Sequence, residues 1–83
     1  MKRNTIKVVW KPLPTEYGWA YLNERRIVLD AGMNDRMVLR TIPHEFAHIY
    51  FPNEPEYKIK AFGIDVGKAL YGEGFRRNHE DDE

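Results

Sequence analysis

The sequence contains no cysteine among its 83 residues, which excludes disulfides and thiolate metal sites. Its 13 basic and 13 acidic residues cancel, and this balance argues against nucleic-acid binding driven by net charge. No apolar run approaches the ~18 residues that a membrane span requires, and no secretory signal is apparent at the N-terminus. We therefore expect a soluble, cytoplasmic protein that binds neither membranes nor nucleic acid.

The length predicts one small domain over residues 1–83, with a polar tail at about residues 76–83. A chain of this size buries only roughly 60% of the surface of its unfolded form, so its hydrophobic core is marginal. Small domains are often supported by disulfides, a bound metal or oligomerisation, and the first of these is excluded here. The sequence leaves the oligomeric state open.

Three segments rich in β-branched and aromatic residues precede two amphipathic ones. Strands are predicted over residues 5–10, 17–22 and 25–30, and helices over about residues 35–51 and 55–70. Asn34 or Asp35 suits the N-cap of the first helix. This order predicts an α+β fold, in which a small three-stranded antiparallel sheet is followed by two helices on one of its faces. Pro43 lies inside the first helix and is expected to kink it or to split it into two pieces.

Residues 44–48 read His-Glu-Phe-Ala-His, an H-E-x-x-H motif on the first predicted helix. Residues advance about 100° each around a helix, so His44 and His48 lie only about 40° apart and can converge on one metal ion. Glu45 flanks them, as a general base acting on water at the metal would. The apolar residues form a separate stripe that can pack on the sheet: Val38, Ile42, Phe46 and Ile49. The alternative is an ordinary amphipathic helix with two incidental histidines.

The motif and its surroundings resemble the minimal zincin metallopeptidases, in particular the gluzincin-like ImmA/IrrE group and the mini-gluzincins. The resemblance rests on GWAYLNERRIVLD, VLRTIPHEFAHIYFP and EYKIKAFG, which together span about residues 18–63. It implies a zinc-dependent hydrolase that cleaves a protein or peptide substrate lying beside an upper strand. It also implies that His44 and His48 bind Zn2+, that Glu45 is the general base, and that a glutamate on the following helix is the third ligand.

Glu56 is the preferred candidate for this third ligand, because it lies at the start of the second predicted helix and a short turn from the first. That helix has an apolar stripe of its own: Ile59, Phe62, Val66 and Leu70. The alternative ligands are Glu54, Asp65, Glu73 and His79. Two residues depart from the family pattern. Lys60 stands where an acidic or amide residue is expected near the ligands, and Pro43 is unusual before the first histidine.

Two functions from different classes remain open. One is a zinc peptidase. The other is a non-catalytic, zinc-stabilised protein-binding module, in which the ion supports a marginal core. A structural zinc site is closed by four protein ligands, whereas a catalytic site has three and keeps a position for water. The sequence offers three plausible ligands and no clear fourth, which favours the enzyme.

Overall fold

The computed structural model describes residues 5–77, which form three strands followed by two helices. The elements in chain order are β1 (Lys7–Lys11), β2 (Gly18–Tyr21), β3 (Arg26–Asp30), α1 (Asp35–Tyr50) and α2 (Glu56–Gly72). The predicted α+β fold class is therefore confirmed.

The sheet has the strand order β1-β3-β2. β2 and β3 form the predicted antiparallel hairpin, but β1 pairs with β3 in parallel, so the expectation of a wholly antiparallel sheet was wrong for this pair. The physical reason lies in the link over residues 12–17, which crosses the end of β3 and places β2 on the far edge. The backbone N–H of Leu13 donates to Asp30 Oδ1 at 3.1 Å, and the N–H of Asp30 donates to the carbonyl of Tyr17 at 2.9 Å.

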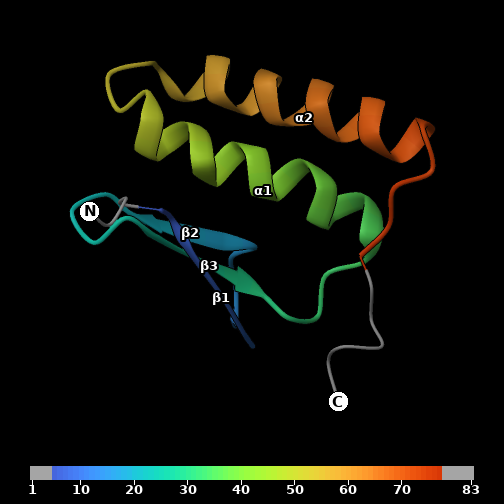
Figure 1. Ribbon diagram of the computed structural model, residues 1–83, viewed down its shortest axis with the longest axis horizontal. Helices are drawn as coiled ribbons and strands as arrows, with labels where there is room; N and C mark the ends of the chain where they lie inside the picture. Colours follow the sequence, from blue (N-terminus) through green and yellow to red (C-terminus); the bar gives the residue numbers. More distant parts are fainter. Residues whose placement is uncertain (1–4, 78–83) are drawn as a thin grey trace.

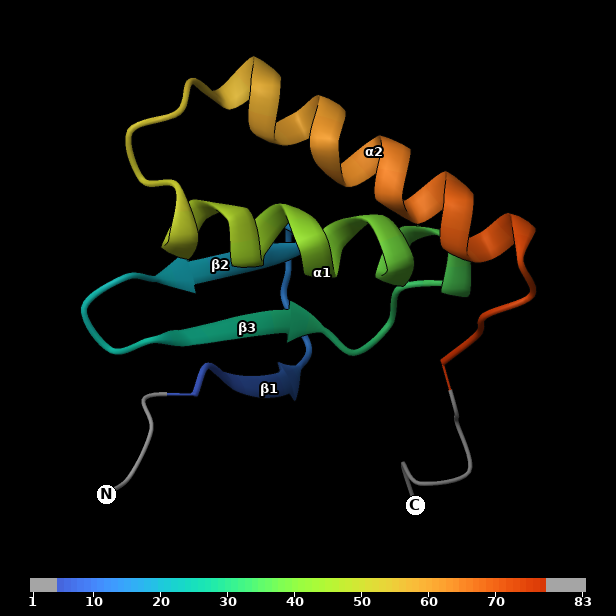
Figure 2. The same cartoon turned by 45° about the horizontal axis from the view of Figure 1, so that its top comes forward.

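The molecule is built of three layers, with the sheet below, α1 in the middle and α2 outermost (Figures 1 and 2). Ile27 and Leu29 of the central strand are completely buried. Val38 and Ile49 of α1 are buried in the same core cluster, against which Ile42 and Phe46 also pack. The predicted apolar stripe of α1 is thus confirmed. No helix described between residues 5 and 77 is both long and apolar enough to cross a membrane.

Helix α1 begins after Asn34, whose side-chain oxygen accepts a hydrogen bond from the backbone N–H of Met37 at 2.9 Å. The helix then continues through Pro43 to Tyr50, so the alternative of two separate pieces was wrong. Proline removes one backbone hydrogen bond of a 16-residue helix that packs against the sheet on one side and α2 on the other. We attribute the continuity of α1 to this packing.

Helix α2 packs on α1 and contacts none of the described strands. Its buried face consists of Ile59, Gly63 and Gly67, whereas Phe62 is 45% exposed, so the predicted stripe was wrong at that position. The glycines explain the difference, because they allow the two helix backbones to approach closely. A Cβ on Gly63 would lie 2.7 Å from the carbonyl oxygen of Arg40, and one on Gly67 would lie 2.7 Å from the Arg40 Cα.

Candidate metal centre

The two histidines of the motif lie on consecutive turns of α1 and face the same space. Their Nε2 atoms are 3.2 Å apart, and their ring centroids are separated by 4.9 Å. The side chain of His44 is 21% exposed and that of His48 is 34% exposed. Neither histidine belongs to the apolar core, so the Nε2 atom of each remains accessible to a metal ion.

The carboxylate of Glu56 completes a triangle with these two nitrogens. Its Oε2 lies 3.2 Å from His44 Nε2, and its Oε1 lies 3.1 Å from His48 Nε2. Ligand atoms bound tetrahedrally at ~2.0–2.1 Å from a zinc ion are about 3.3 Å from one another. The two histidines and the Glu56 carboxylate therefore lie close enough together to share one zinc ion, since one ligand atom of each lies within 4.8 Å of the others. Without an ion, the same contacts are ion pairs whenever the imidazoles are protonated.

Glu56 reaches the histidines because of the way in which α2 leaves the turn after α1. Pro55 is the N-cap of α2, and Glu56 is therefore its first residue. Further along α2, Gly63 lies against His44, where an added Cβ would be 3.1 Å from the His44 Cβ. This close contact at Gly63 keeps α1 and α2 near each other, and these two helices carry the three candidate ligands.

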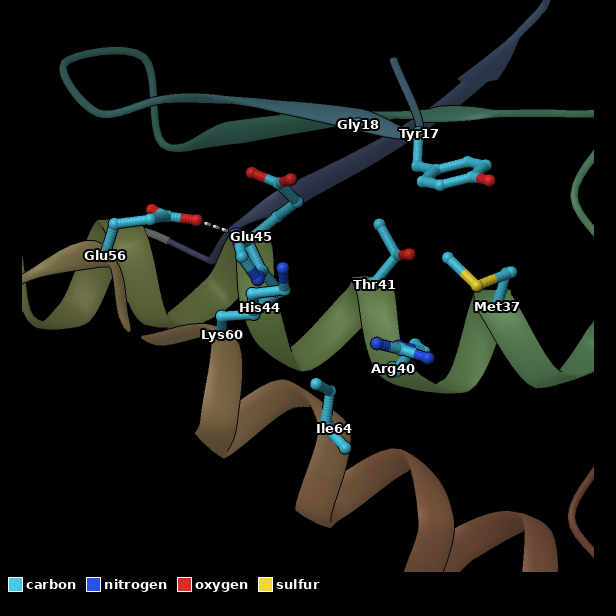
Figure 3. A pocket seen from close by; sticks show the side chains of 10 residues that line it. All are labelled: Tyr17, Gly18, Met37, Arg40, Thr41, His44, Glu45, Glu56, Lys60 and Ile64. Atoms are coloured by element: carbon cyan, nitrogen blue, oxygen red, sulfur yellow. Dashed lines mark ion pairs between the residues drawn. The ribbon is translucent and has the colours of Figure 1, made fainter. Parts of the chain in front are cut away.

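The side chain of Glu45 points from α1 toward β2 (Figure 3), and the residue is only 7% exposed. Strand β2 passes close above it at Gly18, where an added Cβ would lie 3.2 Å from both Cγ and Oε2 of Glu45. Burial, and secondarily the charge of Glu56, raises the pKa of Glu45 to about 7. A carboxyl group with a pKa near neutrality is suited to accept and return protons, although a bound cation would favour its ionised form.

The electrostatic surroundings of His44 favour the form that binds metals. Burial is the main cause that lowers its pKa, and the nearby charges of His48 and Lys60 act in the same direction, while Glu56 opposes them. Imidazole binds a metal ion only when it is neutral. A lowered pKa therefore keeps His44 ready for a metal ion at neutral pH.

Two cavities lie beside the triad, the first lined by residues of α1, α2 and the start of β2, and the second mainly by residues of β2 and α1. The first, here called the Lys60 cavity, has a volume of about 400 Å3 and includes the side chains shown in Figure 3. Its lining residues are Tyr17, Gly18, Met37, Arg40, Thr41, His44, Glu45, Glu56, Lys60 and Ile64. The second, here called the Trp19 cavity, has about 420 Å3 and is lined by Gly18, Trp19, Ala20, Leu22, His44, Glu45, His48 and Pro52. His44 and Glu45 border both cavities, so the candidate centre lies between them.

The other predicted ligand candidates are not brought to this centre. Glu54 forms an ion pair with Lys58 at 3.6 Å, Asp65 is exposed on α2, and Glu73 is the C-cap of that helix. His79 lies outside the described residues. Within residues 5–77, the group of side chains placed to share one ion is His44, His48 and Glu56, whose ligand atoms all lie within 4.8 Å of one another. The described part of the chain therefore brings three candidate ligands together at this centre.

Several residues around the centre were missed by the sequence reasoning. Arg40 and Thr41 precede His44 by four and three positions on α1, so helical spacing alone could have placed them beside the motif. Tyr17 and Gly18 could not have been found in this way, because their position depends on which edge of the sheet β2 occupies.

A scan of protein-family models, a search of curated proteins and a search of solved structures each found no match to this chain. The resemblance to the minimal zincins therefore rests on the residues of the motif and its neighbouring segments.

Proposed function

We propose that this chain is a zinc-dependent peptidase, with His44, His48 and Glu56 as the metal ligands and Glu45 as the general base. The observation that carries the proposal is the convergence of three side chains: the two histidine Nε2 atoms are 3.2 Å apart, and the two oxygens of the Glu56 carboxylate lie 3.2 and 3.1 Å from them. Histidine and carboxylate ligands in this number are typical of catalytic rather than structural zinc. A cytoplasmic location remains part of the proposal.

Zinc would supply Lewis acidity that polarises the scissile carbonyl and lowers the pKa of water toward ~7. Glu45 is placed to do the proton transfers, because it borders both cavities and is not one of the three ligand candidates. It would accept a proton from the attacking water and deliver it to the nitrogen of the leaving amine. Its burial beneath Gly18 holds the carboxylate in one place for both steps.

The substrate would lie along β2. This strand is at an edge of the sheet, and no other described strand pairs with its outer side. Unpaired backbone groups of an edge strand can bind an extended peptide by adding it to the sheet. An antiparallel peptide would run from Leu22 toward Tyr17, so its N-terminal part would lie over the Trp19 cavity and its C-terminal part over the Lys60 cavity. The peptide bond between the two parts would then lie at His44 and Glu45.

The substitution Glu45→Gln tests the proposal most directly. Glutamine has nearly the same shape as glutamate but cannot accept a proton at neutral pH. We expect the variant to bind zinc like the wild-type protein and to lose at least ~100-fold in peptidase activity, the usual contribution of one general base. The measurement is hydrolysis of a mixed library of quenched fluorescent peptides by the zinc-loaded protein, with zinc content measured in parallel. Glu54→Gln, in the exposed turn, is the matched control.

A zinc ion coordinated by four protein ligands, found by X-ray absorption spectroscopy or crystallography, would refute the proposal that the chain is a peptidase. In that case the motif is the metal support of a protein-binding module. Activity that survives Glu45→Gln unchanged would refute the role of this residue while leaving the metal ligands in place.

A further inference from the structure

The Lys60 cavity contains two cationic side chains whose presence the peptidase proposal does not explain. Arg40 on α1 and Lys60 on α2 both line it, and Figure 3 shows Lys60 extending from α2 toward His44. Among residues 5–77, no carboxylate forms an ion pair with either of them. Unpaired cations gathered at one cavity from two different elements indicate an anionic ligand.

The net charge of the Lys60 cavity depends on whether a metal ion is bound to the triad. Without an ion, Glu45 and Glu56 line the same cavity and can balance Arg40 and Lys60. A divalent cation on the triad neutralises these carboxylates, and the cavity then has a net positive charge. An anion would therefore be attracted to the metal-loaded protein, which is also the form that would cleave a substrate.

The rest of the lining indicates the kind of anion. Beyond the two cations, the cavity is bordered by Met37, Ile64 and the ring of Tyr17, so its far end is largely apolar. A volume of about 400 Å3 accommodates an amino-acid side chain together with adjoining backbone. A carboxylate carried on a short hydrocarbon stem fits this combination better than a large polyanion.

We propose that the Lys60 cavity is a specificity subsite for a carboxylate that follows the scissile bond. Arg40 and Lys60 bind this carboxylate, which belongs either to an acidic side chain or to the C-terminus of the substrate. The inference rests on the proposed function and deepens it, because it names the class of peptide that the same centre accepts. It also gives Lys60 a purpose at the position where the resemblance leads one to expect an acidic or amide residue.

Three thiol probes test the subsite without requiring turnover. Each carries a mercaptoacetyl group that binds zinc, followed by glutamate amide, glutamine amide or glutamine with a free C-terminal carboxylate. Glutamate and glutamine have nearly the same shape, so the first two probes differ mainly in one negative charge. Their dissociation constants are measured by calorimetry on zinc-loaded protein. We expect at least one of the two anionic probes to bind about tenfold more tightly than glutamine amide, the scale of one charge-assisted hydrogen bond.

The two sources of the carboxylate are distinguished by which anionic probe is preferred. Preference for glutamate amide assigns the subsite to an acidic side chain, whereas preference for the free acid assigns it to the chain terminus. The preference is the dissociation constant of glutamine amide divided by that of the favoured anionic probe. In Arg40→Gln and in Lys60→Gln this ratio should fall toward one. Lys68→Gln removes the same charge from an exposed position of α2 outside the cavity, and it should leave the preference unchanged.

Other outcomes overturn the inference in distinguishable ways. Equal affinity of the wild-type protein for all three probes would refute the subsite and leave the metal centre intact. A preference that persists in both Arg40→Gln and Lys60→Gln would show that other groups bind the carboxylate. A protein that takes up no zinc, or zinc that binds no thiol, would refute the proposed function and the subsite together.

Discussion

The two helices of this domain are held in place in different ways. α1 packs between the sheet and α2, and its side chains Val38 and Ile49 are buried in the core. α2 contacts only α1 among the described elements, and the centre of that contact is Ile59 with two glycines, Gly63 and Gly67. α1 is therefore fixed by two layers, whereas α2 is fixed by one.

The three candidate metal ligands are distributed over these two differently supported helices. His44 and His48 are on the doubly supported helix, while Glu56 is at the first residue of the singly supported one. A metal ion that binds all three would connect the two helices at the end where they are joined only by a short turn. Because binding to the folded state adds to the free energy of folding, metal affinity and helix packing should influence each other.

Loss of a histidine ligand should have the largest effect. His44→Ala or His48→Ala should abolish zinc uptake, since removing a direct ligand costs more than the ~10- to 100-fold lost with an outer partner. Wild-type protein with zinc at 100 times its dissociation constant should be stabilised by about 2.7 kcal/mol, which corresponds to a melting temperature higher by on the order of 10 °C. Thermal unfolding with and without a chelator measures this shift, which should be absent from both variants. Wild-type protein that melts at one temperature under both conditions would contradict the metal centre.

Glu56 tests whether the singly supported helix supplies a ligand. Glu56→Ala should weaken zinc binding by at least ~10- to 100-fold. The metal-free protein should lose little stability, because the Glu56 side chain is 62% exposed. Competition with a chelating dye gives the affinity, and Asp65→Ala is the control, since it removes an exposed carboxylate from the same helix. If Asp65→Ala alone releases the metal, α2 must be rotated about its axis so that Asp65, and not Glu56, faces the histidines.

Much of α1 could be predicted from the sequence, because strong local signals agree there. Asn34 supplies the N-cap, the apolar residues repeat with helical period, and His44 and His48 follow from their spacing of four. Such signals come from residues near one another in the chain. They do not depend on the rest of the fold.

The pairing of β1 and the rotation of α2 depend on contacts between residues far apart in the chain, which local sequence patterns do not predict. The parallel pairing of β1 follows from a link that crosses β3, and the strand sequences do not specify which edge that link reaches. The predicted stripe of α2 was wrong at Phe62 because the helix packs on α1 through its glycines rather than through its large apolar side chains. Glycines four residues apart on a helix, such as Gly63 and Gly67, can mark a close backbone contact, and this spacing was the available signal.

The contact between the helices can be altered without touching a ligand. Gly67→Ala would place a Cβ 2.6 Å from the Arg40 Cβ and 2.9 Å from the Arg40 backbone nitrogen, so the helices must separate. Overpacking of this kind typically costs about 1–3 kcal/mol. Because Glu56 moves with α2, zinc affinity should also fall, by about tenfold.

Gly72→Ala is the matched control for this substitution. Gly72 is on the same helix, but a Cβ there would meet nothing within 4 Å. The control should fold at least as stably as the wild-type protein, since alanine is the better helix former. Urea unfolding and zinc titration of both variants make the comparison. Unchanged zinc affinity in Gly67→Ala, together with reduced stability, would show that the glycine contact supports α2 without positioning Glu56.

Glu45 lies on the other side of α1, where the helix meets β2, and its titration reports on the packing there. Burial raises its pKa to about 7, whereas an unfolded chain has a glutamate pKa near 4.3. Between about pH 4.5 and 7 the folded protein therefore holds a proton that the unfolded chain releases. Its stability should fall as the pH rises through this window and then become constant above it. Below about pH 4.5 the carboxyl is protonated in both states and contributes no penalty.

Glu45→Gln removes this titration from the metal-free protein. The variant should match the wild-type protein at pH 4 and exceed its stability at pH 7.5 by about 1–2 kcal/mol, an amount reduced because solvent reaches part of the cleft. Melting temperatures across this range, measured with a chelator present, give the difference. Glu73→Gln makes the same substitution at an exposed position and is the control. A constant difference between Glu45→Gln and wild type at all pH values would mean that β2 does not bury the Glu45 carboxylate. The part of α1 beside Gly18 would then be open to water, and the layered packing would bury only the apolar side chains of this helix.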